Sequence, residues 1–350
     1  MKTYGFAATD ASTPLAPYSF ERRAPRDNDV VMEILYSGVC HSDLHQARDD
    51  WGWSSAYPIV PGHEIVGRVI EIGSGVTKYK VGDYAAIGCM VDSCQSCDQC
   101  RKGEEQLCRE GNTGTYNARD RITGDLTFGG YSKHIVVREE FACRIPAGLD
   151  LSRAAPLLCA GITTYSPLRT WNVGVGTRVG VIGLGGLGHM AVKLAAAMGA
   201  EVTVISRSTD KADDAKALGA DNYLVSADPA AMKAARSSFD LIVDTVPVRH
   251  DVDPYMPLLD VDGTLVIVGQ VGPMNAFNSL PLLSGRRRIA ASPIGGIQQT
   301  QELLDFCARK NILPDVEMIR MDQINDAFKR MESADVRYRF VIDMASLQHG

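Results

Sequence analysis

The feature that most constrains the fold of this chain is a regular alternation of short apolar runs with helical runs over residues 177–292. The apolar runs read TRVGVIG, EVTVIS, NYLV, FDLIVD, TLVIV and RIAAS. Helical periodicity separates them at 187–198, 210–218, 228–236 and near 252–259. Strands that alternate with helices form a parallel sheet covered on both faces, because each connection must cross back over the sheet. The sequence therefore predicts an α/β region built on a doubly wound parallel sheet.

The first 150 residues have a different sequence pattern. Gly and Pro punctuate them, and their β-like runs are short, as at 30–35, 64–72 and 84–87. After Pro293, two amphipathic helices and a final strand, RYRFVID, do not extend the alternation and are expected to return to the first domain. The sequence thus predicts two domains, a β-rich one of residues 1–153 with 294–350 and an α/β one of residues 154–293.

Composition narrows the class of protein. The chain has 350 residues, 45% of them hydrophobic, so two domains can each bury a core. A formal net charge of −6 gives no electrostatic basis for binding nucleic acid or an anionic membrane. The short arginine cluster at 286–288 is expected to be solvent-exposed at the start of a strand. No apolar stretch approaches the roughly 20 residues of a membrane span, and the first ten residues lack the pattern of a signal peptide. We expect a soluble, cytoplasmic protein.

A G-x-G-x-x-G motif follows the first strand of the alternation and opens a helix. Such a turn lets the backbone approach a pyrophosphate, and the helix N-terminus offers N–H groups and partial positive charge to it. A purely structural Gly-rich turn is the alternative, but the strand–turn–helix context favours a Rossmann dinucleotide site. Its predicted residues are Gly183, Gly185, Gly186, Leu187 and Gly188.

The end of the second strand indicates which dinucleotide is bound. NAD sites place Asp or Glu there for the ribose 2′-OH. This chain instead has Ser206, Arg207 and Ser208, with Lys211 close by. These donors suit a 2′-phosphate, which Arg can bind through two N–H groups, so we predict NADP(H). The alternative is a polar helix cap with solvated charges.

Four of the nine cysteines form a C-x2-C-x2-C-x7-C cluster, comprising Cys94, Cys97, Cys100 and Cys108. Four thiolates at close spacing on a loop make a closed tetrahedral zinc site without an open position, so this zinc is predicted to be structural. Four free thiols are the alternative. In a cytoplasmic chain, metal binding explains the cluster better than a disulfide framework does.

A second, dispersed set contains Cys40, His63 and Cys159. Three protein ligands leave a fourth position for water or substrate, which is the geometry of a catalytic zinc. Each residue taken alone is more typical of a protein core. Their combination with a structural-zinc cluster and a dinucleotide fold favours a catalytic metal.

The chain resembles the zinc-dependent medium-chain alcohol dehydrogenases, and most closely their cinnamyl alcohol dehydrogenase branch. The resemblance extends over essentially the whole chain and implies a GroES-like fold for the β-rich catalytic domain. It is carried by the four-cysteine lobe and by motifs that match in order: GHE at 62–64, GGYS at 129–132, LLCAGITTYSPL at 157–168, GLGGLGH at 183–189 and DVRYRFVID at 335–343.

The resemblance implies roles for the residues of the catalytic set. Cys40, His63 and Cys159 correspond to the catalytic zinc ligands, and Glu64 corresponds to an acidic neighbour that supports or alternates with them. Asp43 matches the carboxylate that hydrogen-bonds the ligating histidine and fixes its tautomer.

Four further roles follow from the same resemblance. Ser42 and His45 match the hydroxyl and imidazole that relay the proton of the alcohol to water. His41 matches a position that contacts the cofactor phosphates, and Thr163 matches one that lines the nicotinamide.

The expected function is that of an NADPH-preferring zinc alcohol dehydrogenase, or aldehyde reductase, with a broad range of aromatic or bulky apolar substrates. Zinc would polarise the substrate oxygen while the nicotinamide carries the hydride. Two alternatives remain: an NAD-dependent polyol or secondary alcohol dehydrogenase, and a catalytically silent protein that binds NADPH and zinc. Two zinc ions per chain, a homodimer and a small-molecule substrate are expected.

Three residues are expected near the substrate. Trp51 and Trp53 follow the relay residues in the sequence. They form an aromatic wall of the substrate pocket or only anchor a loop, and the sequence favours neither alternative. Cys89 precedes the zinc lobe and lines the pocket or serves as a small buried hydrophobe. Pro293 replaces an aromatic residue of the lignin-precursor enzymes, so a broad aldehyde range is expected.

Overall fold

The computed structural model describes residues 1–348, which divide into two compact units. Unit 1 contains Met1–Ile162 with Gly295–Gly350, and unit 2 contains Thr163–Ile294. The described chain has no helix that is both long and apolar enough to cross a membrane.

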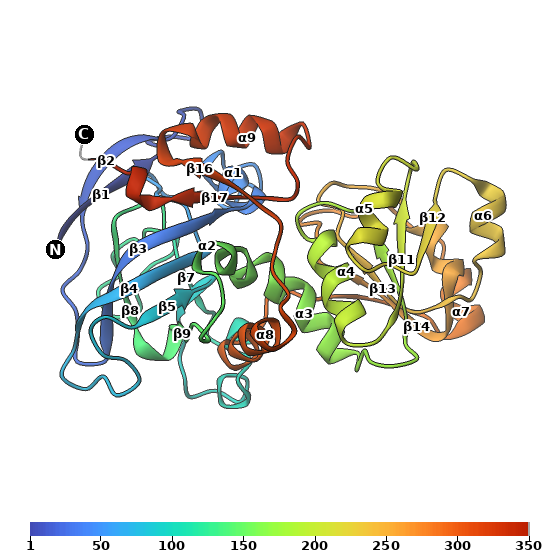
Figure 1. Cartoon of the computed structure of the whole chain (residues 1–350), viewed down its shortest axis with the longest axis horizontal. Helices are drawn as coiled ribbons and strands as arrows, with labels where there is room; N and C mark the ends of the chain where they lie inside the picture. The colour runs from blue at the N-terminus through green and yellow to red at the C-terminus, as the bar shows by residue number, and fades with distance from the viewer. Residues whose placement is uncertain (349–350) are drawn as a thin grey trace. The chain divides into compact units, whose positions relative to one another are not determined.

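Unit 2 is a six-stranded parallel sheet in the order β12-β11-β10-β13-β14-β15 (Figure 1). This order reverses between β10 and β13, which is the doubly wound arrangement that the sequence predicted. The central strands are buried along nearly their whole length, as their apolar runs require. The strands are β10 (Arg178–Ile182), β11 (Glu201–Ser206), β12 (Asn222–Val225), β13 (Phe239–Asp244), β14 (Leu259–Ile267) and β15 (Arg288–Ala291).

Helices connect these strands. The expected helix near 252–259 is a 3-10 helix, η5 (Asp253–Leu258), because prolines at its start and at Pro257 remove the N–H groups that an α-helix needs. The short helix α7 was not anticipated. The α-helices are α4 (Gly188–Ala197), α5 (Ala212–Ala217), α6 (Pro229–Ala234) and α7 (Leu280–Gly285).

Unit 1 is built on a seven-stranded sheet in the order β16-β17-β3-β4-β5-β9, with β8 also paired to β3. Two-stranded sheets β1-β2 and β6-β7 complete its β structure. The strands are β1 (Lys2–Ala7), β2 (Ala16–Glu21), β3 (Asp29–Val39), β4 (Ile65–Ile72), β5 (Tyr84–Ile87), β6 (Met90–Asp92), β7 (Thr113–Gly114), β8 (His134–Arg138), β9 (Cys143–Arg144), β16 (Val316–Arg320) and β17 (Arg339–Asp343).

The helices of unit 1 come from both of its chain segments. Figure 1 shows α9 along β16 and β17. The 3-10 helix η4 (Ala155–Leu158) packs against β3, β4 and β17, which explains why unit 1 extends to residue 162 rather than to the expected boundary at 153. The α-helices are α1 (His41–Ala47), α2 (Leu151–Ala154), α8 (Ile297–Lys310) and α9 (Ile324–Glu332), while α3 (Ala160–Thr170) runs across the division between the units.

The register of the large sheet gathers residues that are far apart in the sequence. β3 ends at Val39 and pairs antiparallel with the start of β4 at Ile65, while β17 pairs with the other side of β3. The residues at these strand ends are therefore neighbours, and they include Cys40, Glu64 and Arg339.

Candidate active site

Helix α1 begins directly after β3, with Cys40 as its N-cap residue. The Asp43 carboxylate accepts a hydrogen bond from the Cys40 backbone N–H at 3.0 Å, which satisfies a donor at the helix start. Because the helix is short and follows a buried strand, Cys40 is held at a defined place beside the sheet. Its side chain is buried.

The Asp43 carboxylate is fully buried and accepts hydrogen bonds from four donors. One oxygen accepts from Nδ1 of His63 and from the Gly62 N–H, both at 2.9 Å. The other accepts from the Tyr131 hydroxyl and the Cys40 N–H, both at 3.0 Å. Since a carboxylate only accepts, Nδ1 of His63 carries the proton and Nε2 is left to bind a metal.

Cys40, His63, Glu64 and Cys159 form a cluster whose potential ligand atoms lie within 4.8 Å of one another. The two sulfur atoms are 4.0 Å apart, close to the separation of about 3.8 Å that two thiolates have on a tetrahedral zinc. Among the described residues, buried Oε2 of Glu64 has no hydrogen-bond partner. Two thiolates, one imidazole and an unsatisfied carboxylate oxygen fit a zinc ion with an exchangeable position.

The pKa values of the groups in this cluster are shifted in different directions by their neighbours. The hydrogen bond from Cys159 holds the pKa of Cys40 well below its usual value, whereas the pKa of Cys159 is raised for the same reason. Burial lowers the pKa of His63, but the Asp43 carboxylate outweighs it and raises the pKa. The lowered pKa favours Cys40 as a thiolate ligand, whereas Cys159 and His63 would release protons when a metal binds.

Glu64 also forms a fully buried ion pair with Arg339. Burial raises the pKa of Glu64 to about 7, while the guanidinium opposes that shift. One carboxylate oxygen accepts from arginine, and the same carboxylate belongs to the metal-ligand cluster. The structure therefore adds Arg339, on β17, to the residues that support this site.

Ser42 and His45 lie three residues apart on α1 and so share one face of the helix. Nδ1 of His45 is 2.9 Å from the Asp50 carboxylate, which is 41% exposed. The imidazole is therefore hydrogen-bonded to a carboxylate at the protein surface. Asp50 was not among the residues predicted from the sequence.

Two tryptophans, Trp51 and Trp53, follow Asp50 in the sequence. The ring centroids of His45 and Trp51 are 5.5 Å apart, and those of Trp51 and Trp53 are 4.5 Å apart. Trp53 is 58% exposed. Cys89 lies close to Cys159, and its thiol is 3.7 Å from the Leu158 carbonyl oxygen.

The four-cysteine lobe brings together the sulfur atoms of Cys94, Cys97, Cys100 and Cys108. Cys94 Sγ and Cys100 Sγ are 3.9 Å apart, again near the thiolate spacing on zinc. Backbone N–H groups of Cys97 and Cys100 point at Cys94 Sγ and Cys97 Sγ, at 3.3 Å and 3.5 Å. This all-thiolate set, stabilised by N–H donors, fits a closed zinc site.

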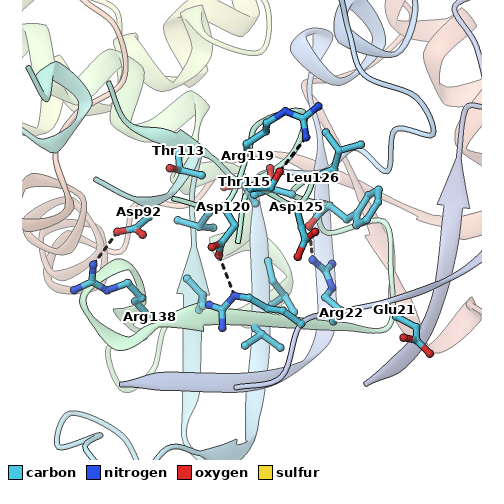
Figure 2. Close-up of a pocket in the computed structure, with 18 residues that line it drawn as sticks. Glu21, Arg22, Asp92, Thr113, Thr115, Arg119, Asp120, Asp125, Leu126 and Arg138 are labelled. Atoms are coloured by element: carbon cyan, nitrogen blue, oxygen red, sulfur yellow. Dashed lines mark hydrogen bonds and ion pairs between the residues drawn. The ribbon is translucent and has the colours of Figure 1, made fainter. Parts of the chain in front are cut away.

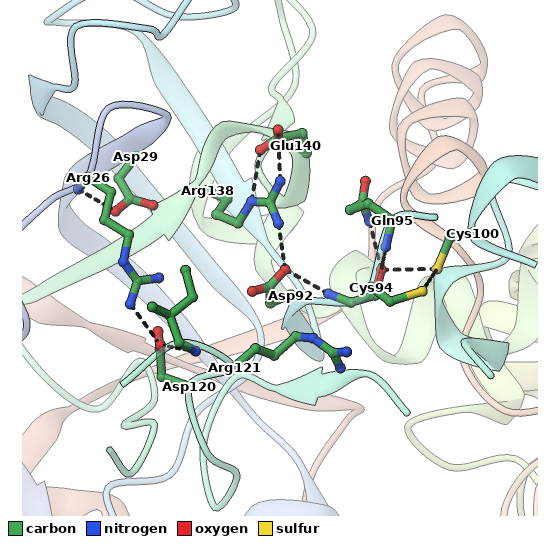
Figure 3. Close-up of polar contacts among 12 residues, drawn as sticks. Arg26, Asp29, Asp92, Cys94, Gln95, Cys100, Asp120, Arg121, Arg138 and Glu140 are labelled. Carbon is green, nitrogen blue, oxygen red and sulfur yellow. Dashed lines mark hydrogen bonds and ion pairs between the residues drawn. The ribbon is translucent and has the colours of Figure 1, made fainter. Parts of the chain in front are cut away.

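Polar contacts tie the lobe to the sheet of unit 1 (Figure 3). The Ser93 hydroxyl is 3.2 Å from Cys100 Sγ, while the Ser93 N–H donates to Asp92 at 2.8 Å. Asp92 in turn pairs with Arg138 on β8, and Arg138 also pairs with Glu140. A cysteine ligand is thereby linked to a strand through two intervening residues.

The glycine-rich turn of unit 2 begins where β10 ends. Gly183 has φ +86°, and a Cβ at Gly188 would lie 2.2 Å from the Gly183 carbonyl oxygen, so the turn packs tightly against the start of α4. A Cβ at Gly185 would meet nothing within 4 Å. The turn thus leaves open space at its middle glycine, as a pyrophosphate requires.

The end of β11 presents polar and basic groups. Ser206 is the last residue of the strand, and Arg207 is exposed. Ser208 donates to Asp210 at 2.9 Å, and Nζ of Lys211 donates to the Leu184 carbonyl oxygen at 2.9 Å. The Lys211 cation therefore lies against the glycine-rich turn, while Arg207 extends into solvent.

His41 and Thr163 lie on different helices. His41 is the first residue of α1, and burial lowers the pKa of its imidazole. Thr163 is buried within α3.

A cavity of about 440 Å³ opens elsewhere in unit 1 (Figure 2). Its charges are engaged in its own wall: Arg23 pairs with Asp120, and Arg138 pairs with Asp92. Arg22 donates to three backbone carbonyl oxygens and a serine hydroxyl. Within the described chain, none of the predicted ligands or relay residues lines this cavity.

Comparisons with known proteins identify the family of this chain. Residues 26–147 match the family described as alcohol dehydrogenase GroES-like domain, and residues 186–309 match zinc-binding dehydrogenase. The chain is 53% identical to NADP-dependent alcohol dehydrogenase C 1 of Mycolicibacterium smegmatis over 98% of both chains.

Solved structures are also similar to this chain. It is 45% identical to the structure of a cinnamyl alcohol dehydrogenase from Sorghum bicolor, with a TM-score of 0.96 over 100% of this chain and 99% of that one. A cinnamyl alcohol dehydrogenase from Helicobacter pylori complexed with NADP(H) is 39% identical, with a TM-score of 0.93 over 99% of both chains. The chain therefore belongs to the zinc-dependent medium-chain alcohol dehydrogenases, in their cinnamyl alcohol dehydrogenase-like branch.

Proposed function

We propose that this protein is an NADPH-preferring zinc alcohol dehydrogenase that interconverts primary alcohols and aldehydes. The observation that carries the proposal is the cluster of Cys40, His63 and Cys159 with the unsatisfied Glu64 oxygen, because an open ligand set serves catalysis rather than structure. The NADP-dependent relative and the NADP(H)-bound neighbour support the choice of cofactor. The closed four-cysteine lobe is proposed to hold a second, structural zinc.

When bound, zinc polarises the substrate oxygen as a Lewis acid and the nicotinamide supplies or accepts the hydride. The protein's own contribution is to hold the ligands in place. Asp43 keeps Nε2 of His63 free for the metal through its bond to Nδ1. Arg339 restrains Glu64, so that one carboxylate oxygen stays among the ligands.

We assign proton transfer to α1. In aldehyde reduction the Ser42 hydroxyl gives its proton to the substrate oxygen and is reprotonated by His45, and in alcohol oxidation the proton moves the other way. The exposed Asp50 carboxylate orients the imidazole through Nδ1. This path lets charge on the substrate oxygen be neutralised without opening the site to water. Positioned acid–base groups of this kind contribute about 10²–10⁴-fold to a rate.

For the cofactor, we assign the pyrophosphate to the Gly183–Gly188 turn and the 2′-phosphate to Ser206, Arg207 and Ser208. The exposed Arg207 guanidinium is available to make two hydrogen bonds to a phosphate. Lys211 adds positive charge next to the turn. His41 is proposed to contact the cofactor phosphates and Thr163 to line the nicotinamide.

The substrate class is proposed to be aromatic or bulky apolar aldehydes, with reduction as the working direction. Trp51 supports this choice because its ring lies beside His45, at the end of the proposed relay. Cys89, next to Cys159, is proposed as a further wall. We also propose a cytoplasmic homodimer; the free cysteines suit a reducing compartment.

The test follows NADPH absorbance after addition of cinnamaldehyde-like and short aliphatic aldehydes, with NADH in a parallel run. Rapid loss of NADPH with little loss of NADH is expected. Equal use of NADH would overturn the cofactor assignment and favour the NAD-dependent alternative. No turnover of any carbonyl compound by protein shown to hold two zinc ions would favour a silent binding protein.

A further inference from the structure

Helix α1 carries the proposed relay but has only seven residues, too few to be stable alone. Its position must therefore be set by contacts from outside the helix. Two tyrosine hydroxyls make such contacts with its backbone carbonyl oxygens. Tyr116 donates to Ser42 at 3.2 Å in the first turn, and Tyr57 donates to Ala47 at 2.9 Å in the last.

The direction of each hydrogen bond around Tyr116 can be assigned. Asn117 Oδ1 accepts from a backbone N–H, that of Ala56, so its amide nitrogen must be the donor to Gln46 Oε1 at 3.1 Å. Gln46 therefore donates through Nε2 to the Tyr116 hydroxyl at 3.0 Å. The hydroxyl has one proton, which it gives to the Ser42 carbonyl oxygen.

These contacts place Tyr116 between the metal-ligand cluster and the relay. The residue is 5% exposed, and its ring centroid is 5.8 Å from that of His63. Its hydroxyl holds the main chain of Ser42 and the side chain of Gln46, one helical turn apart. One phenol therefore contacts α1 at two positions that are one turn apart.

We propose that Tyr116 is a positioning residue for proton transfer, acting through the backbone of Ser42. The inference rests on the proposed function, because it assumes that Ser42 is the first group of the relay. A hydroxyl that must meet the substrate oxygen within hydrogen-bond distance tolerates little displacement, and small misplacements cost about 10- to 100-fold in rate. Tyr116 itself exchanges no proton with the substrate.

The test compares Tyr116→Phe with Tyr57→Phe. Both changes remove one phenolic hydroxyl bonded to an α1 carbonyl oxygen, but only the first acts at Ser42. In Tyr116→Phe we expect kcat to fall about 10-fold and the KM for the aldehyde to stay within about 3-fold of its value in the unchanged protein. The solvent deuterium isotope effect on kcat should become larger. Zinc content per chain should stay the same. Tyr57→Phe should leave kcat and the isotope effect near those of the unchanged protein.

Hydrogen–deuterium exchange of the peptide covering residues 40–47 supplies a readout that needs no turnover. Faster exchange in Tyr116→Phe than in Tyr57→Phe at the start of the helix is expected. If the unchanged protein reduces aldehydes but the two variants behave alike, the inference is wrong and the function stands. If the unchanged protein reduces no aldehyde, the proposed function is wrong. In that case, equal hydrogen–deuterium exchange of residues 40–47 in the two variants would also show that Tyr116 does not position α1.

Gln46→Met provides a second test of the same contact in case the Tyr116→Phe variant folds poorly. This change removes the donor to the Tyr116 hydroxyl while keeping the length and the apolar stem of the side chain. We expect the same increase in the isotope effect and a smaller fall in kcat. An unchanged isotope effect in this variant, with a normal zinc content, would contradict the proposal.

Discussion

Nδ1 of His63 lies 2.9 Å from the Asp43 carboxylate, and this one contact decides which imidazole nitrogen faces the metal ligands. Both residues are buried, and the carboxylate accepts three further hydrogen bonds. An acceptor so fully surrounded by donors cannot rotate away from the histidine. The ligand set is thus organised before any metal binds.

Asp43→Asn should weaken binding of the catalytic zinc. An amide NH₂ would face N–H and O–H donors, leaving buried groups unpaired and releasing the His63 tautomer. The affinity of this site for zinc should fall about 10- to 100-fold, measured by competition with a chelator. Asp50→Asn is the control, since it changes an exposed carboxylate that also contacts a histidine. Equal affinity in both variants would show that Asp43 does not orient the ligand.

Ser42→Ala should reduce kcat about 100-fold or more, because the first acid–base group of the proposed relay is lost. Steady-state kinetics with NADPH and an aldehyde measure this effect. Ser152→Ala, the same chemical change near the start of α2, is the control and should have no effect on kcat. Undiminished turnover in Ser42→Ala would remove Ser42 from the mechanism.

Arg207→Ala should reverse much of the preference for NADPH. Charge-assisted hydrogen bonds contribute about 1.5–3 kcal/mol, so kcat/KM with NADPH should fall roughly 10- to 100-fold while the value with NADH changes little. Lys211→Gln should change the preference less, because Nζ is already bonded to the Leu184 carbonyl oxygen. Arg236→Ala, another exposed cation of unit 2, is the control. A parallel loss with both cofactors would place Arg207 outside the 2′-phosphate site.

Ser93→Ala should accelerate loss of the structural zinc. The Ser93 hydroxyl contacts Cys100 Sγ, and removing that hydrogen bond leaves the thiolate less stabilised. Release to a chromogenic chelator should be several-fold faster, with about 1 kcal/mol less stability to unfolding. Asp98→Asn is the control, because it changes an exposed carboxylate on the same lobe that is bonded to Arg109 and Gln99. Identical release from both variants would contradict a role for Ser93.

Local sequence patterns predicted the elements that are defined by short-range periodicity. The run FDLIVD became β13 with the expected bounds, because a buried parallel strand is apolar along its whole length. By contrast, β2 alternates between exposed and half-buried residues and includes Pro17, so little in its sequence distinguishes it from a loop. Helix α1 opens with histidine, serine and aspartate, none a strong helix former, and its seven residues are too few to be stable without tertiary contacts.

The metal-ligand candidates and the partner of His63, Asp43, were predicted from motifs and family resemblance, whereas Tyr131 and Arg339 were given no role. Tyr131 and Arg339 lie within sequence motifs, GGYS and DVRYRFVID, but neither spacing nor periodicity indicates that they contact Asp43 and Glu64. Those contacts depend on strand register across the sheet. A single sequence does not reveal such long-range pairings, since the partners of a strand are chosen by packing of the whole domain.

Unit 1 is discontinuous in the sequence, and this has a consequence for biosynthesis. The ribosome adds Cys40, His63 and Cys159 early, but β17 emerges only with residues 339–343. Until then the end of β3, at residues 36–39, lacks its β17 partner, and Glu64 lacks the Arg339 guanidinium. A nascent chain therefore cannot enclose its metal pocket during most of translation. The contacts that surround Glu64 are therefore complete only when β17, the last strand of the sheet to be synthesised, has joined β3.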